Sequence, residues 1–281
     1  MVIDFHTHVF ERHNAPRIML DMAERARIPS FADGTLDGLL RSMEASGVDL
    51  SVISRITTRP EQVRPVNDWL AGLQGPRIRS LATMHPGLPF LCDEVGRLAE
   101  RGFPGFKLHP DYQGFFVDEK RMFPFYEAAR DAGMWILFHA GLDRGLPGRE
   151  VHAPPERLLR VHEAVPGLRI VAAHMGGEDL YEETERYLLG RDIYLDTSFV
   201  LRKMSAAVLE RMLCKHPAER ILFGSDSPWS HPGQELAYLS SLDFLPARER
   251  ERITGGNAAE LLGMVPPSSS GRSALAGGAA P

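Results

Sequence analysis

The sequence predicts an α/β protein, a slightly distorted (β/α)8 TIM barrel with an insertion after its first strand. Three observations favour this fold. Short apolar segments alternate with longer amphipathic ones along the chain, eight short segments can be identified, and no GxGxxG motif follows the first of them. Alternating strands and helices indicate a parallel sheet, and eight such repeats indicate a sheet that closes into a barrel. The alternative is an open doubly wound sheet, which the missing GxGxxG disfavours.

Most of the expected strands are apolar at successive positions. This pattern is typical of strands that helices cover on one side and that face a packed barrel interior on the other. In chain order the expected strands are 2–5, 50–54, 80–84, 105–108, 135–138, 170–173, 193–196 and 221–223.

Between these strands, the apolar residues follow the period of an α-helix. Thr35 has the side chain expected of a helix cap, and Gly47 and Gly133 stand just past two helix ends. The clearest expected helices are 36–45, 93–101, 124–132, 155–164, 179–189 and 205–214.

Two regions interrupt this rhythm. Residues 9–34 form an insertion between the first strand and the first helix, and residues 17–27 within it have a helical pattern, so we expect a lid over the barrel mouth. Residues 266–281 are rich in Pro, Ser, Gly and Ala, which predicts a disordered tail without a catalytic role. The barrel is therefore expected to span residues 1–265 as one domain, a usual length for this fold.

Composition and charge exclude several classes of function. The chain has 32 basic and 37 acidic residues, a net charge of −5, and no basic stripe that would attract nucleic acid. No apolar run is long enough to cross a membrane, and the N-terminus lacks the pattern of a signal peptide. The two cysteines, Cys92 and Cys214, lie far apart, which favours a reducing compartment. We therefore expect a cytoplasmic protein that acts on a small molecule, without nucleic-acid or membrane partners.

Residue types that bind metals gather at the expected strand ends. His6 and His8 are two positions apart in the first strand, so both side chains point to the same face. An HxH pair alone is a weak signal in a chain with 11 histidines. Active sites of these barrels lie where the strands end, however, and further candidates end other strands. They are His109, His139, His174 and Asp226.

The carboxylate of Asp226 supports the same conclusion. It follows an apolar strand, and a carboxylate at a barrel mouth is costly to desolvate without a cation or hydrogen-bond donors. The alternative is an aspartate that caps the next helix. Because four histidines are expected at the same barrel mouth, a metal site is favoured over a helix cap.

The order of four short motifs resembles the amidohydrolase superfamily. They are the HxH at 6–8, Phe-His-Ala-Gly at 138–141, Ala-His-Met-Gly-Gly at 173–177 and Gly-Ser-Asp-Ser-Pro at 224–228. Within the superfamily the chain is similar to the amidohydrolase-2 group, which includes aminocarboxymuconate semialdehyde decarboxylase and related decarboxylases and hydratases. Residues 256–263 are also similar to the final helix of that group. The resemblance covers about residues 1–264 and is specific for family and fold, not for reaction.

The resemblance implies a role for each motif. His6, His8 and His139 would be metal ligands, and Asp226 would be a ligand or a proton acceptor. In binuclear members of the superfamily, the residue that corresponds to His174 binds a second metal. In the mononuclear, decarboxylase-like members it is an acid/base or electrostatic residue, which is the role we favour here.

Four further residues are candidates for contacts with substrate or with a second metal. A lysine at the position of Lys107 is carboxylated and bridges two metals in some superfamily members; unmodified, it would bind a substrate carboxylate or stay charged beside Asp226. His109 either faces the pocket or is satisfied in the barrel wall. Arg55 has the geometry to bind a carboxylate with two hydrogen bonds, and Trp229 is a candidate pocket wall. For Arg55 and Trp229, surface exposure and packing are the alternatives.

The expected reaction uses one divalent metal, with zinc favoured, because three histidines and one aspartate leave a position for water or substrate. Such a metal lowers the pKa of bound water to about 7, and Asp226 or His174 would take or return a proton. The metal-bound hydroxide would then hydrolyse a carbonyl substrate, or assist the non-oxidative decarboxylation of a small carboxylate-bearing one. The alternatives are a metal-free lactonase of the same fold and a non-catalytic metal-binding barrel. Because relatives of this fold form dimers, a homodimer is expected.

Overall fold

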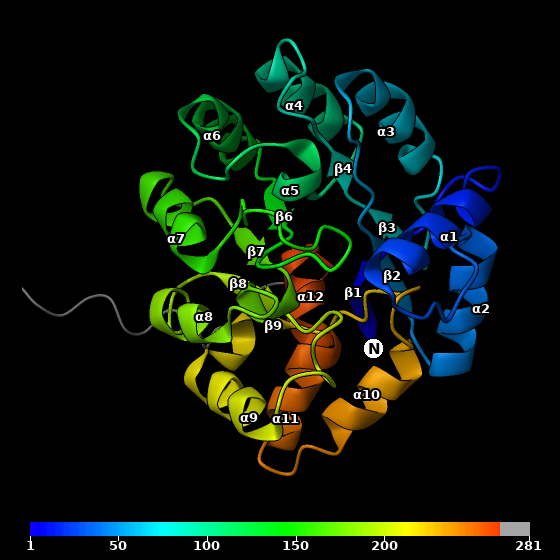
Figure 1. The fold of residues 1–281 in the computed structure, drawn as a ribbon, viewed down its shortest axis with the longest axis vertical. Helices are drawn as coiled ribbons and strands as arrows, with labels where there is room; N and C mark the ends of the chain where they lie inside the picture. The colour runs from blue at the N-terminus through cyan, green and yellow to red at the C-terminus, as the bar shows by residue number, and fades with distance from the viewer. Residues whose placement is uncertain (265–281) are drawn as a thin grey trace, which may run out of the picture.

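Short parallel strands form the wall of a barrel in the computed structural model, which describes residues 1–264 (Figure 1). Only Leu81 separates β3 from β4, and its N–H donates to Ile53 O on β2 (2.9 Å), so β3 and β4 are two halves of one barrel strand. The eight predicted strands are therefore all present. Their bounds are β1 (Ile3–Thr7), β2 (Leu50–Ile53), β3 (Ile78–Ser80), β4 (Ala82–Thr83), β5 (Gly105–Leu108), β6 (Trp135–Phe138), β7 (Ile170–Ala172), β8 (Tyr194–Asp196) and β9 (Ile221–Leu222).

Backbone hydrogen bonds between β1 and the segment around the end of β9 close the barrel. Phe5 N donates to Phe223 O (2.8 Å), and Asp226 N donates to His6 O (2.8 Å). All pairs of neighbouring strands are parallel, so all strands end at the same mouth. This confirms the predicted (β/α)8 barrel and excludes the open sheet.

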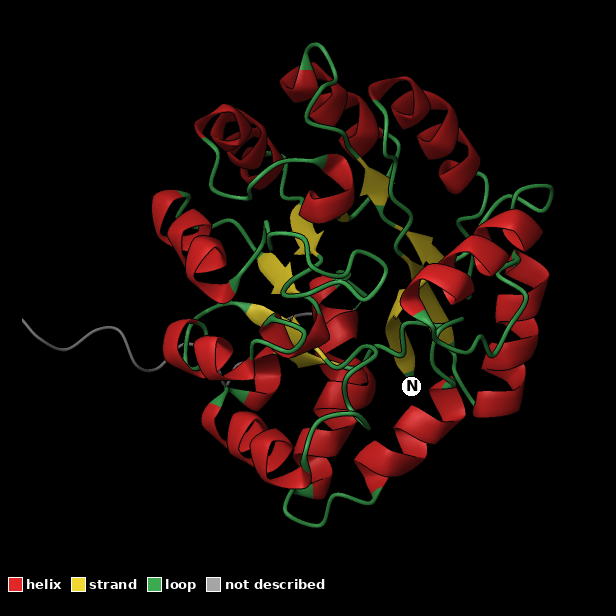
Figure 2. Cartoon of the chain, viewed as in Figure 1, coloured by secondary structure: helices red, strands yellow, loops and turns green. Residues whose placement is uncertain are grey.

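Helices surround the strands on the outside of the barrel (Figure 2). Thr35 caps the first of this ring as expected, because its Oγ1 accepts a hydrogen bond from Gly38 N (3.0 Å). The bounds of the ring are α2 (Leu36–Ser46), α3 (Val63–Ala71), α4 (Leu91–Glu100), α6 (Phe123–Asp131), α7 (Pro155–Ala164), α8 (Tyr181–Tyr187), α9 (Ala206–Lys215) and α10 (Pro232–Ser240). Shorter helices are α5 (Pro110–Gln113), α11 (Ala247–Glu251) and α12 (Asn257–Leu261).

The six predicted helices of the ring are all present, but α3 and α10 were not predicted from the sequence. Pro65 lies within α3, and Pro232 and Gly233 begin α10. Proline and glycine indicate breaks in a sequence, yet proline is tolerated in the first turn because the N–H groups there have no partner within the helix.

The strands separate two hydrophobic cores. On β6, Trp135 and Leu137 point into the barrel, whereas Ile136 and Phe138 pack against the surrounding helices. Helix α12 adds three apolar side chains to the interior core and packs against β1 and β9. Just before α12, Gly255 lies against Met1 O at the start of β1. Helix α12 therefore covers the end of the barrel opposite the mouth, and the site lies at the other end.

The insertion after β1 contains helix α1 (Ala15–Ala26), close to the helical segment predicted at 17–27. Ala15 and Met19 anchor it to the molecule. Gly34, at the end of the insertion, has φ +72, and a Cβ there would lie 2.6 Å from Met19 Sδ. This position before α2 therefore requires a glycine. The predicted tail at 266–281 lies outside the described residues.

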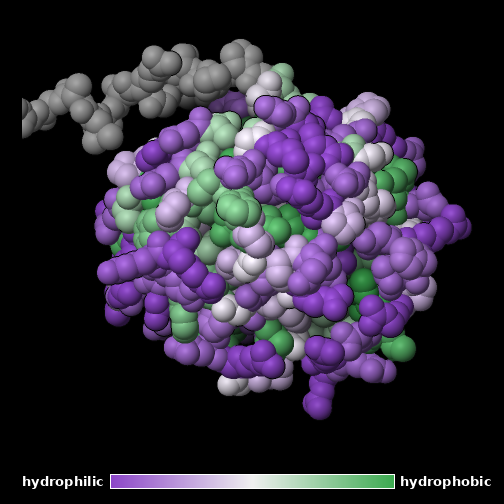
Figure 3. All heavy atoms as spheres, turned by 90° about the horizontal axis from the view of Figure 1, so that it is seen from above, coloured by the Kyte–Doolittle hydropathy of each residue, from purple (hydrophilic) through white to green (hydrophobic). Residues whose placement is uncertain are grey.

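The surface of residues 1–264 is mostly hydrophilic on the side shown in Figure 3, with small hydrophobic groups between. No helix in this part of the chain is long and apolar enough to span a membrane. Cys92 and Cys214 are both exposed and unpaired.

Candidate active site

His6 and His8 reach the barrel mouth through an irregularity in β1. The pairing of β1 with β2 shifts register within the strand. Two successive side chains therefore face inward: Phe5 packs against Trp135, with ring centroids 4.9 Å apart, and His6 Nε2 lies 3.1 Å from Lys107 Nζ. In a regular strand such neighbours would point to opposite faces.

Asp226 joins the two histidines. Its Oδ1 lies 2.9 Å from His8 Nε2 and 3.6 Å from His6 Nε2. The residue has a left-handed backbone conformation, with φ 67. The three side chains form a group whose ligand atoms all lie within 4.8 Å of one another. The structure thus brings together three of the four ligands expected from the sequence.

His139, the fourth expected ligand, belongs to a neighbouring group. Its Nδ1 lies 3.0 Å from His174 Nε2, and its buried Nε2 has no hydrogen-bond partner within residues 1–264, with Asp143 Oδ2 at 3.9 Å. His109 Nε2 approaches the same carboxylate oxygen at 3.0 Å, and the rings of His109 and His139 stack with centroids 4.0 Å apart. His109, His139 and Asp143 are a second group that could hold a metal ion.

His174 stands just beyond β7, close to the end of the strand expected at 170–173. It begins the 3-10 turn η3 (His174–Gly176), and both His174 and Met175 have positive φ, 59 and 55. Such conformations are uncommon for residues other than glycine and persist where the surroundings hold them. Here the N–H of His174 donates to Asp196 Oδ1 (3.0 Å).

Two residues that the sequence analysis did not single out contact the histidines. Asp196 Oδ2 lies 2.9 Å from His6 Nδ1, and Ser198 Oγ lies 2.9 Å from His6 Nδ1 and 3.0 Å from His174 Nδ1. Asp196 ends an expected strand, so the reasoning that selected the histidines also applies to it. Asp143 lies on the loop after β6, where no sequence signal marks it.

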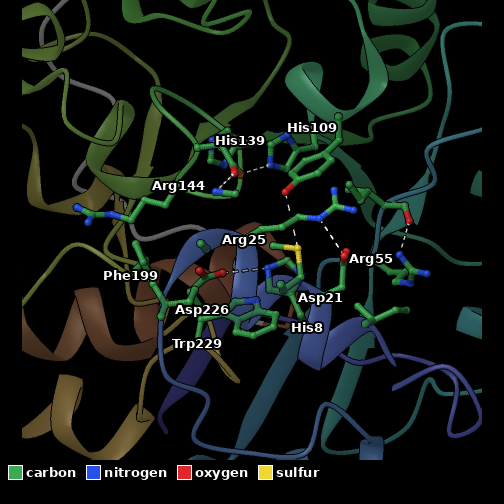
Figure 4. Close-up of a pocket in the computed structure, with 18 of the residues that line it drawn as sticks. His8, Asp21, Arg25, Arg55, His109, His139, Arg144, Phe199, Asp226 and Trp229 are labelled. Atoms are coloured by element: carbon green, nitrogen blue, oxygen red, sulfur yellow. Dashed lines mark hydrogen bonds and ion pairs between the residues drawn. The ribbon is translucent and has the colours of Figure 1, made fainter. Parts of the chain in front are cut away.

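The site opens into a cavity of about 370 Å³ (Figure 4). Helix α1 of the insertion forms one wall, with Ile18, Met22 and Ala26, and the hydroxyl of Tyr112 donates to Met22 Sδ (3.7 Å). All the site residues expected from the sequence line this cavity. They are His6, His8, His139, His174, Asp226, Lys107, His109, Arg55 and Trp229.

Arg55 is a loosely paired cation in the cavity wall. Its side chain is 17% exposed, and its guanidinium lies over the ring of Phe10, 5.1 Å from the centroid. Nη1 donates to Ile56 O (2.6 Å), Nη2 is 3.8 Å from Glu11 Oε2, and the buried Nε has no partner in the part of the chain that the structure describes. This guanidinium therefore retains capacity to bind an anion.

Burial controls the charges at the mouth. It lowers the pKa of His6 to about 4, with a contribution from Lys107, and it lowers the pKa of Lys107 to about 8 against the attraction of Asp196 and Asp226. Burial alone would raise the pKa of Asp226, but the hydrogen bond with His8 and the nearby histidines lower it overall. At neutral pH, His6 is therefore neutral and Asp226 is a carboxylate, the states that metal binding requires.

The arrangement of donor atoms fits a divalent metal ion. Ligand atoms around a tetrahedral zinc, with bonds of about 2.0–2.1 Å, lie roughly 3.3 Å apart. The distances from Asp226 Oδ1 to His8 and His6, 2.9 and 3.6 Å, bracket that separation. The buried Nε2 of His139 lacks a partner, and such an atom calls for an ion or a donor.

Fold and site together define a (β/α)8 barrel with a histidine–aspartate centre at its mouth. A family model described as amidohydrolase matches residues 3–264. The chain therefore belongs to the amidohydrolase family, in the amidohydrolase-2 group that its motifs indicated. No curated protein matches the chain in sequence.

Solved structures share the fold over nearly the whole chain. The 2,6-dihydroxybenzoate decarboxylase from Rhizobium is 18% identical, with a TM-score of 0.71, and the match covers 94% of this chain and 98% of that one. A dihydroxybenzoic acid decarboxylase from Polaromonas, solved with bound manganese and the inhibitor 2-nitroresorcinol, is 18% identical, with a TM-score of 0.70 and coverage of 94% and 97%. The 5-carboxyvanillate decarboxylase from Sphingomonas paucimobilis is 17% identical, with a TM-score of 0.67, and the match covers 93% of this chain and 98% of that one.

Proposed function

We propose that this protein is a metal-dependent decarboxylase, which removes carbon dioxide from a small organic acid without oxidising it. The observation that carries the proposal is the group formed by His6, His8 and Asp226 at the cavity, with ligand atoms within 4.8 Å of one another. The three related structures described above support the choice of reaction, because each is a decarboxylase with this fold.

His6, His8, His139 and Asp226 are the residues that would hold one divalent ion. When bound, the ion supplies a Lewis acid that polarises a carboxylate or carbonyl oxygen of the substrate. Three imidazoles and one carboxylate suit zinc, which we propose first. Manganese is the alternative, because the Polaromonas enzyme carries it. A second ion would require carboxylation of Lys107 or use of the group around Asp143.

Decarboxylation requires side chains of this protein to deliver one proton to the substrate. When the bond to the carboxylate breaks, its electron pair stays on the carbon, and a proton must reach that carbon as carbon dioxide leaves. Asp226 contacts His6 and His8 through Oδ1, and we assign to its Oδ2 the role of taking up a proton from water and passing it to that carbon. His174 is the alternative acid/base residue, and it would have to exchange its contact with His139 Nδ1 (3.0 Å) for one with the substrate.

Arg55 and Lys107 would hold the substrate. Arg55 is a partly buried guanidinium in the cavity wall, and its Nε has no partner among the described residues, so a carboxylate or another anionic group of the substrate would complete its hydrogen bonds. The cavity wall that α1 and Trp229 provide combines four apolar side chains with three charged ones, so it suits a small organic acid. They are Ile18, Met22, Ala26, Trp229, Arg17, Asp21 and Arg25. The two unpaired cysteines fit a cytoplasmic enzyme, and we propose a homodimer.

The test combines metal analysis with product detection. We expect about one equivalent of divalent metal per chain, and release of carbon dioxide from some member of a panel of small aromatic and aliphatic acids. Chelation should abolish this release, and zinc or manganese should restore it. Release of carbon dioxide by protein shown to contain no metal would overturn the role of the metal, and hydrolysis of a lactone by such protein would select the metal-free lactonase.

Hydrolysis is the second candidate. The observation that favours it is the family itself, whose description is amidohydrolase, and the same residues would orient water towards a carbonyl group. Esters and lactones therefore belong in the same screen. Cleavage of one of them without release of carbon dioxide from any acid would select hydrolysis.

A further inference from the structure

The end of β8 and the residues just after it contact two histidines of the site directly and a third through one of them. Asp196 and Ser198 are two residues apart on this segment and are completely buried. Between them they contact His6 Nδ1 and His174 Nδ1, and His174 in turn contacts His139. Because each neutral imidazole carries one proton, these contacts decide which nitrogen of each ring is protonated.

The position of each ring proton follows from its hydrogen-bond partners, beginning with a backbone carbonyl. His174 Nδ1 lies 3.0 Å from Ser198 O, which can only accept a hydrogen bond, so Nδ1 of His174 carries the proton. Its Nε2 then has a lone pair, which accepts a hydrogen bond from Nδ1 of His139 at 3.0 Å. The Nε2 of His139 is left with a lone pair, and this is the buried nitrogen that has no partner.

The hydrogen-bond partners of His6 fix the position of its ring proton in the same way. Oδ2 of Asp196 lies 2.9 Å from His6 Nδ1 and accepts its proton. The hydroxyl of Ser198 has a single proton, which it donates to Asp196 Oδ1. The Nε2 of His6 therefore has a lone pair, which faces Lys107 Nζ at 3.1 Å.

We infer that Asp196 and the backbone carbonyl of Ser198 are positioning groups, which keep the protons of His6, His174 and His139 on Nδ1 and so present Nε2 of His6 and His139 as lone-pair donors. This inference depends on the proposed function only in treating those two nitrogens as metal ligands. His174 then acts through His139, which it orients. Partners of this kind commonly change metal affinity by about 10–100-fold.

The decisive variant is Asp196→Asn. Oδ1 of Asp196 accepts from His174 N, Ser198 N and Ser198 Oγ, so the oxygen of an asparagine would stay there. Its amide group would then point N–H bonds at His6 Nδ1. His6 can avoid this clash only by moving its proton to Nε2, which removes the lone pair.

Nitrogen NMR of the metal-free, full-length protein with labelled histidine reads these protons directly, with His6→Gln to assign the His6 signals. In the wild type we expect His6, His174 and His139 in the form protonated at Nδ1. In Asp196→Asn we expect His6 in the form protonated at Nε2, and an affinity for zinc or manganese that is about 10–100-fold weaker.

Two controls separate the role from general disruption. Asp4→Asn alters an equally buried side chain that accepts from Ser225 N and Oγ and from the backbone N–H of His6. Because none of these hydrogen bonds involves the imidazole ring, the form of His6 should not change. Ser198→Ala keeps the backbone carbonyl, so His174 should stay protonated at Nδ1. A wild type with His6 or His174 protonated at Nε2 would overturn the inference, whatever the enzyme's activity. Weaker metal binding in Asp196→Asn with His6 unchanged would instead make Asp196 a direct ligand.

Discussion

At the scale of single residues, side chains enter the site from unusual backbone conformations. Asp226 and His174 have φ values of 67 and 59, and a register shift in β1 turns His6 inward. Each strained residue costs on the order of 1–3 kcal/mol, so the surroundings must hold it. They do so through backbone groups: Asp226 N donates to His6 O, and His174 N donates to Asp196.

Asp226→Asn tests the metal centre. The substitution keeps the shape of the side chain but removes the charge that joins His6 and His8, so the affinity for divalent metal should fall by at least about 100-fold and turnover should be lost. Metal content after dialysis and circular dichroism are the measurements. Asp243→Asn, at an exposed aspartate, is the matched control and should keep its metal. Retention of full metal content in Asp226→Asn would remove this residue from the ligand set.

Arg55→Lys tests substrate binding. Lysine keeps the positive charge but cannot form the two parallel hydrogen bonds of a guanidinium, so KM should rise about 10-fold while kcat changes little. Steady-state kinetics with the best acid from the screen measure both constants. Arg12→Lys, at a mostly exposed arginine outside the cavity lining, serves as the control. An unchanged KM would exclude Arg55 from the substrate site.

His216 makes stability depend on pH at a place remote from the site. It is buried, Nε2 donates to Ile193 O (3.0 Å), and Nδ1 accepts from Gly190 N (3.3 Å). Burial lowers its pKa from 6.5 to about 4, so between these pH values the unfolded chain binds more protons than the folded one. The free energy of unfolding should therefore fall as the pH drops from 6.5 to 4, by up to about 3 kcal/mol from this residue.

Urea unfolding at a series of pH values measures this effect. His216→Gln should show a shallower decline below pH 6.5 than the wild type, because glutamine does not titrate. His13→Gln, at an exposed histidine, should follow the wild type. Parallel curves for His216→Gln and the wild type would show that His216 does not contribute.

At the scale of elements, helix α1 forms one wall of the cavity, whereas the expected metal ligands lie at the ends of barrel strands. Leu20 is 61% exposed on α1, so a substitution there tests the helix and not a buried contact. Leu20→Pro should disrupt α1, since proline inside a helix costs about 3 kcal/mol. We expect kcat/KM to fall about 10-fold or more, with metal content unchanged. Leu20→Ala is the matched control and should remain active.

Kinetics and metal analysis of both variants decide the outcome. Loss of bound metal in Leu20→Pro would show that α1 supports the barrel mouth itself. Unchanged kinetics in Leu20→Pro would show that the helix does not act as a lid.

The elements also show why sequence prediction succeeded for some and failed for others. The strands were predictable because buried parallel strands are apolar on both faces, which leaves a clear signal in short segments such as β6. Helices α3 and α10 were missed because Pro65, Pro232 and Gly233 indicate breaks, although tertiary packing and the free first turn accommodate them. Strand ends likewise predicted which residues would line the cavity.

At the scale of the whole molecule, binding of a metal at the mouth should stabilise the closed barrel. His6 and Asp226 come from β1 and the segment after β9, where the barrel closes, and an ion that binds only the folded state adds about 2.7 kcal/mol at 100 times its Kd. Removal of the metal should therefore lower Tm by roughly 5–10 °C. Thermal unfolding with and without chelator measures the shift. The Asp226→Asn variant is the control, and a shift of equal size in that variant would contradict the assignment.

The sequence by itself determined the barrel, the amidohydrolase family and nine of the residues that line the cavity. These features depend on local periodicity and on the rule that parallel strands end at one mouth. Only the tertiary structure decided how those residues pair. Asp196 meets His6 across 190 positions of the chain, His139 turns to His174 and Asp143, and α1 supplies a wall. Such pairings depend on barrel closure, on a register shift and on positive φ values, all of which arise from contacts between distant segments and leave no periodic pattern in the sequence.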